Sequence, residues 1–79
     1  MNTLWVAEYS PTHDRDGCFP WHIGTLQDHL MSNVRQLMEG NGFRNDWYMV
    51  GGPFESNDDA AVYLDALRRR IGWSRDESH

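Results

Sequence analysis

Residues 47–60 read WYMVGGPFESNDDA, and this stretch joins the two kinds of secondary structure that the chain contains. Its first part is aromatic and apolar, as strands are, and Gly51-Gly52-Pro53 predicts the end of that strand. Ser56, followed three residues later by Asp59, predicts a helix N-terminus, because a serine hydroxyl can accept a hydrogen bond from the backbone N–H three residues on. The stretch therefore predicts a strand, a turn and a helix in direct succession.

Two amphipathic helices are predicted on either side of this strand. Thr25, with Asp28 three residues later, repeats the capping pattern of Ser56 and starts the first helix. Its apolar stripe comprises Leu26, Leu30, Val34 and Leu37, flanked by Met31 and Met38, and Gly40-Asn41-Gly42 ends it. The second helix carries Ala60, Leu64, Leu67 and Ile71 and ends at Gly72. We expect both stripes to pack against a sheet.

Thr3–Tyr9 and Asp46–Gly51 have the composition of strands, and Cys18–Ile23 predicts a third, short strand. Pro20 places that third strand at an edge, since proline cannot donate to a sheet ladder. The turn-forming residues 10–17 connect the first two strands. We therefore predict an α+β fold of order ββαβα. It has a small antiparallel or mixed sheet of two to three strands, the first strand central, and both helices on one face. Residues 1–73 form one domain and residues 74–79 a polar tail.

The balance of charged residues disfavours two classes of binding partner. Twelve acidic residues against seven arginines, with no lysine, give a net charge of −5. Such a surface disfavours direct binding to nucleic acid or to anionic membranes. Cys18 is the only cysteine, no intramolecular disulfide can form, and we recognise no secretory signal, so we expect a cytoplasmic location.

Residues that could carry chemistry are few. His13, Asp14, Asp16, Cys18 and His22 fall within ten residues, which leaves a small metal-binding protein as one alternative, although the paired cysteines of structural zinc sites are missing. No nucleophile with its base, phosphate-binding glycine loop or catalytic carboxylate pair is recognisable. We therefore predict that the protein is not an enzyme and has no cofactor. Arg68-Arg69-Arg70 is interpreted as a solvated helix end paired with Asp65.

Residues 47–60 resemble the central motif of SPOR-type peptidoglycan-binding domains, in which a strand runs into Gly-Pro-Phe, a small polar cap and a helix with an early alanine. Here these are Gly52-Pro53-Phe54, Ser56 and Ala60. The resemblance implies a βαββαβ fold and binding of glycan strands, and it provides the alternative hypothesis of a peptidoglycan-binding domain.

The chain also resembles, in type rather than in motif, the small acidic proteins that bacteriophages and mobile elements use against host defences, including anti-CRISPR and anti-restriction inhibitors. Our leading hypothesis is a non-enzymatic protein-binding module of this type, which binds a larger host protein or complex with a basic, nucleic-acid-handling surface. We also expect a homodimer. The residues expected to contact the partner are aromatic or acidic: Trp5, Tyr9, Trp21, Trp47, Tyr48, Asp14, Asp16, Glu55, Asp58 and Asp59.

Overall fold

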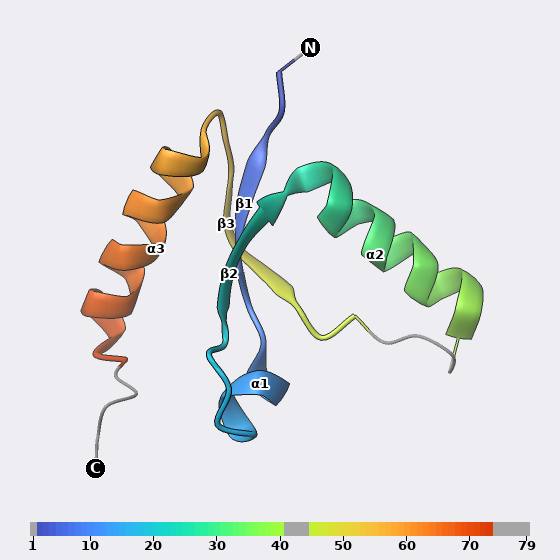
Figure 1. The fold of residues 1–79 in the computed structure, drawn as a ribbon, viewed down its shortest axis with the longest axis horizontal. Coiled ribbons are helices and arrows are strands. Elements are labelled where there is room, and N and C mark those ends of the chain that lie inside the picture. Colours follow the sequence, from blue (N-terminus) through green and yellow to red (C-terminus); the bar gives the residue numbers. More distant parts are fainter. Residues whose placement is uncertain (1, 41–44, 74–79) are drawn as a thin grey trace.

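The computed structural model describes residues 2–40 and 45–73, and Figure 1 traces their path. The elements are β1 (Trp5–Tyr9), α1 (Pro11–Arg15), β2 (Trp21–Thr25), α2 (Leu26–Glu39), β3 (Tyr48–Phe54) and α3 (Asn57–Ile71). The three strands form one antiparallel sheet of order β2-β1-β3. The predicted α+β fold and the central position of the first strand are confirmed. The predicted tail, residues 74–79, lies outside the described residues, as do Asn41 and Gly42 of the predicted helix stop.

One short helix was missed in the sequence. The segment after β1, expected as a turn, contains the five-residue α1. Ser10 accepts a hydrogen bond from the backbone N–H of His13, and Pro11 occupies the first helical turn. These are the residue types that start helices, because serine satisfies a free N–H and proline has none to satisfy.

The strand boundaries also differ from the predicted ones. β2 begins at Trp21, so Pro20 precedes the strand, which does lie at an edge of the sheet. β3 continues through Gly51 and Pro53 to Phe54 instead of ending at the glycines. Its pairing with β1 is irregular, with register shifts on both sides of Ala7. An edge strand tolerates both the proline and the irregular pairing because one of its sides bonds to no strand.

The two long helices lie on opposite faces of the sheet, which corrects the prediction that both pack on one face (Figure 1). Ala7 belongs to the core cluster beneath α3, whereas its neighbour Glu8 bonds to His29 of α2. Successive side chains of a strand point to opposite faces. The sheet is therefore the central layer, with one helix on each side.

The apolar core lies between the sheet and α3. Ala7, Trp21 and Leu64 are buried together, and Trp73 packs edge-on against Trp21 with the ring centroids 5.8 Å apart. Tyr63 donates a hydrogen bond from its hydroxyl to the carbonyl oxygen of Val50 at 2.8 Å. This half of the molecule follows the sequence pattern.

Both long helices begin with a side-chain cap. The predicted caps are confirmed, since Thr25 accepts from Asp28 N–H at 3.1 Å and Ser56 accepts from Asp59 N–H at 3.0 Å. Gly72 ends α3 in the left-handed conformation. Across residues 2–40 and 45–73, the helices lack the length and apolar character needed to cross a membrane.

Candidate functional site

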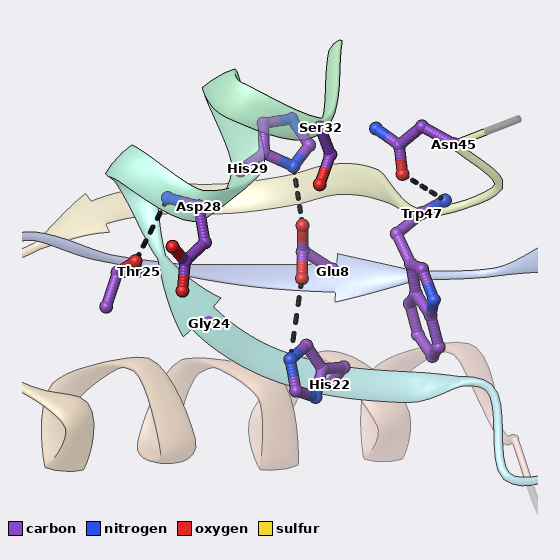
Figure 2. Close-up of a pocket in the computed structure, with 9 residues that line it drawn as sticks. All are labelled: Glu8, His22, Gly24, Thr25, Asp28, His29, Ser32, Asn45 and Trp47. Carbon is purple, nitrogen blue, oxygen red and sulfur yellow. Dashed lines mark hydrogen bonds and ion pairs between the residues drawn. The ribbon is translucent and has the colours of Figure 1, made fainter. Parts of the chain in front are cut away.

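A polar pocket of about 220 Å³ lies between α2 and the sheet, and Figure 2 draws its lining. β1 and β2 supply its floor, α2 one wall, and the segment before β3 the other. The lining residues are Glu8, His22, Gly24, Thr25, Asp28, His29, Ser32, Asn45 and Trp47.

Glu8 is the central residue of this pocket. Its carboxylate accepts a hydrogen bond from Nδ1 of His29 through Oε2, at 2.5 Å, while Oε1 faces Nε2 of His22 at 3.8 Å (Figure 2). Glu8 and His29 are only 6% and 8% exposed. A buried carboxylate is costly unless a donor satisfies it, so the bond to His29 compensates for the burial of Glu8 and attaches α2 to β1.

One part of the pocket lining is formed by aromatic rings that lie close together. The ring centroid of Trp47 lies 5.4 Å from that of His22 and 4.8 Å from that of His13. In β2, His22 pairs with Glu8 and Gly24 pairs with Val6, and a Cβ on Gly24 would lie 3.3 Å from Glu8 Oε1 and from His22 Nε2. The small residue thus leaves room for the carboxylate and the imidazole side by side.

The contact between α2 and the segment before β3 is also polar. Asn45 donates from its backbone N–H to Oε1 of Gln36 at 2.5 Å, and from Nδ2 to Oδ1 of Asn33 at 2.6 Å. On a helix with 100° per residue, His29, Ser32 and Gln36 share one side. α2 therefore faces the sheet and the 45–47 segment with its polar side.

The apolar side of α2 points into solvent. We call it the outer face of α2, and it comprises Leu30 (50% exposed), Met31 (59%), Val34 (45%), Leu37 (84%) and Met38 (81%). Its centre lies about 180° around the helix from the polar side. The prediction that this stripe packs on the sheet is therefore wrong, because the Glu8–His29 bond and the Asn45 bonds turn the helix the other way.

Two open grooves run beside the outer face. One, of about 550 Å³, lies between the first turns of α2 and the chain before β1, with Leu4, Leu26 and Leu30 among its lining. The other, of about 430 Å³, is lined by Met31, Val34 and Met38 with polar neighbours further along the helix. Met31 borders both, so the apolar surface is continuous along α2.

The structure does not gather the predicted aromatic contact residues on one open surface. Trp21 is buried beneath α3 with the Tyr9 ring 4.6 Å away, and Trp5 is half-buried in β1. Trp47 lies on the other face of the sheet, in the polar pocket. Only Tyr48, 59% exposed, presents most of its surface. The expected aromatic face is thus largely the core that α3 and Trp73 cover.

The predicted acidic residues fall into two groups at opposite ends of the sheet. Asp14 and Asp16 belong to α1 and its end, next to the end of β1 where Tyr9 pairs with Tyr48. The other group, Glu55, Asp58 and Asp59, is exposed at the start of α3, beyond the end of β3 that pairs with Trp5. Asp65 pairs with Arg68 and Arg69 as predicted, at 3.3 and 2.7 Å.

Asp14 has one further contact of note. The Tyr9 hydroxyl donates to Asp14 Oδ2 at 2.5 Å. This hydrogen bond, together with burial and the negative charge of Asp14, raises the pKa of Tyr9 above its ordinary value of 10.0. The contact attaches α1 to the end of β1.

The described side chains limit the chemistry of the pocket. Among residues 2–40 and 45–73, no three histidine, cysteine, aspartate or glutamate side chains lie close enough to hold a metal ion, so His13, Cys18 and His22, which are near one another in the sequence, do not form such a group. A carboxylate on Nδ1 of an imidazole can orient a general base. In this pair both members are buried and connect a strand to a helix.

The sequence pattern did not identify the Glu8–His29 pair or the outer face. The available signal was that Glu8 interrupts an otherwise apolar strand, and that His29 lies opposite the apolar stripe of its helix.

Comparison of the chain with protein-family models, with curated protein sequences and with solved structures found no match.

Proposed function

We propose that this protein is a non-enzymatic protein-binding module that docks through the outer face of α2. The observation that carries the proposal is the exposure of Leu30, Met31, Val34, Leu37 and Met38 on one side of one helix. Single exposed apolar residues are ordinary on protein surfaces, but contiguous exposed patches of large side chains mark interaction sites.

The attachment of α2 supports the same proposal. An isolated amphipathic helix beside an apolar sheet gains stability by turning its apolar side inward. Here the buried Glu8–His29 bond and the two Asn45 bonds favour the opposite orientation. In this proposal the polar pocket is a structural device that presents the outer face, and it performs no catalysis.

The finer hypothesis of an inhibitor that binds a basic, nucleic-acid-handling host protein belongs to this proposal as well. Its support is the net charge of −5 and the exposed carboxylates Glu55, Asp58 and Asp59 at the start of α3. These carboxylates lie on an element across the sheet from α2, so they stay accessible when the outer face is covered. They would steer a positively charged partner by long-range attraction.

A photo-crosslinking residue introduced at position 37 tests the docking proposal in cells that express the protein. Leu37 is 84% exposed on the outer face, and Val62, 70% exposed on α3, provides a matched control position. We expect an adduct with protein from position 37 and little from position 62. Equal labelling at both positions, or none at position 37, would refute the outer face as a docking surface.

A further inference from the structure

We infer that the occupant of the outer face is a second copy of this chain, bound through an antiparallel pair of α2 helices. The inference rests on the proposed function, since it names the partner of the same surface. Three features of α2 carry it: the spacing of its apolar residues, the spacing of two opposite charges, and the grooves on either side of Met31.

The apolar residues of the outer face follow a seven-residue repeat. Met31 and Met38 occupy one core position of the repeat, Val34 the other, and Leu30 and Leu37 a flanking position. In an antiparallel helix pair with a two-fold axis between residues 32 and 33, Met31 meets Val34 of the second copy and Leu30 meets Leu37. A two-fold interface has this property: both copies use the same patch, so if one residue contacts a second residue of the other copy, the second also contacts the first.

The charges beside the outer face are complementary in the same arrangement. Asp28 and Arg35 are one heptad apart and project within about 20° of each other, along one edge of the outer face. In an antiparallel pair this edge meets the same edge of the second helix, so Asp28 of each copy faces Arg35 of the other. Within one chain Arg35 pairs with Glu39 at 2.7 Å, and across residues 2–40 and 45–73 no cationic side chain lies within ion-pair distance of Asp28. In a parallel pair this edge would instead lie beside the opposite edge of the second helix, which carries Leu30 and Leu37, so neither charge would meet a charge of opposite sign.

The grooves and the helix dipoles favour the pair too. The grooves of about 550 and 430 Å³ on either side of Met31 provide recesses for apolar side chains of the second helix. Antiparallel helices also place the positive end of each dipole beside the negative end of the other. A contact limited to four helical turns is smaller than the roughly 800 Å² per partner of a standard interface, so we expect dissociation in the micromolar range.

A charge-exchange experiment on the full chain tests the inference. Asp28→Arg alone places two arginines together at each end of the pair, and Arg35→Asp alone places two aspartates together. We expect each variant to weaken the dimer about tenfold or more in sedimentation equilibrium. An equimolar mixture of the two variants restores both attractive contacts, so it should form the heterodimer at the affinity of the original chain.

Apolar variants provide the matched control. Leu37→Glu should give a monomer of 9.2 kDa with an unchanged circular dichroism spectrum, whereas Val62→Glu, on α3, should keep the dimer. A chain that is monomeric at 100 μM, or a dimer that survives Leu37→Glu, would overturn the inference. If the mixed charge variants dimerise no better than either alone, the antiparallel arrangement is wrong. Adducts from position 37 at a mass other than twice that of one chain would overturn the self-pairing while leaving the docking surface intact.

Discussion

α2 and α3 are both amphipathic, both begin with the same kind of cap, and yet they use their apolar sides in opposite ways. α3 packs Ala60 and Leu64 against the sheet, at 0% and 7% exposure. α2 leaves Leu37 and Met38 more than four-fifths exposed and buries His29 instead. The difference lies in the face of the sheet that each helix meets, because Ala7 projects toward α3 and Glu8 toward α2. One buried carboxylate thus decides which side of a helix faces inward.

Removal of the His29 side chain is the change that we expect to destabilise the attachment of α2 most strongly. His29→Ala leaves the buried Glu8 carboxylate without its 2.5 Å donor, and leaving a buried ionised group without its hydrogen-bond partner costs about 3 kcal/mol or more. The free energy of unfolding from urea titration should fall by that amount. Amide hydrogen exchange should accelerate in α2 more than in α3.

The matched control for this change is His22→Ala. His22 is exposed, and its Nε2 lies 3.8 Å from Glu8, beyond hydrogen-bond distance. We expect a loss under about 1 kcal/mol, as for an exposed ion pair. An equal loss for both variants would show that Glu8 does not depend on His29 in particular.

Leucine truncations compare the two apolar sides directly. Leu64→Ala opens a cavity beneath α3 and should lower the free energy of unfolding by about 2–5 kcal/mol at any protein concentration. Leu37→Ala removes an exposed side chain and should cost under about 0.5 kcal/mol in dilute protein. In concentrated protein the Leu37 effect should grow, because in the proposed dimer the second copy would stabilise the folded state by mass action. Similar losses for both variants in dilute protein would contradict the difference between the helices.

Alkaline pH should weaken the hydrogen bond between Tyr9 and Asp14, which attaches α1 to the end of β1. The raised pKa of Tyr9 means that the folded protein keeps this proton at a pH where the unfolded chain loses it. The stability that this bond contributes is therefore complete below pH 10.0 and is lost as pH rises through the folded-state pKa. Tyr9→Phe should cost about 0.5–1 kcal/mol at neutral pH and flatten this alkaline decline.

An absorbance titration of tyrosinate provides the spectroscopic check on Tyr9. One of the three tyrosines should ionise above the pH of free tyrosine, and this late transition should be absent from Tyr9→Phe. If the late transition persists in the variant, the hydrogen bond to Asp14 is not its cause.

Loss of exposed ion pairs should have the smallest effect on the free energy of unfolding, and the effect should be similar for α2 and α3. Asp65→Asn removes the contacts to Arg68 and Arg69 on α3, and Glu39→Gln removes the contact to Arg35 on α2. Each should change the free energy of unfolding by about 0.3–0.5 kcal/mol, as pairs at this spacing do. A much larger effect on one helix would mean that surface charge, rather than the buried Glu8–His29 pair, separates the two.

The sequence was sufficient for what depends on local signals. Thr25 and Ser56 predicted where the helices begin, Gly72 where α3 ends, and the apolar strand Thr3–Tyr9 the centre of the sheet. The orientation of α2 was not predictable in this way, because its apolar stripe has the same spacing as the stripe of α3. The orientation of α2 depends on a contact between Glu8 and His29, which are 21 residues apart in the sequence. The spacing of apolar residues within either segment does not predict such a contact.

Oxidation of the methionines by hydrogen peroxide, followed by mass spectrometry, tests the orientation of α2 most directly. Met31 and Met38 are 59% and 81% exposed, so in dilute protein both should oxidise at nearly the rate of an unfolded peptide. In concentrated protein both should become protected, because the proposed dimer would cover them. Protection of Met31 and Met38 at every concentration, in folded monomer, would mean that the apolar side of α2 packs inward, and would contradict the account.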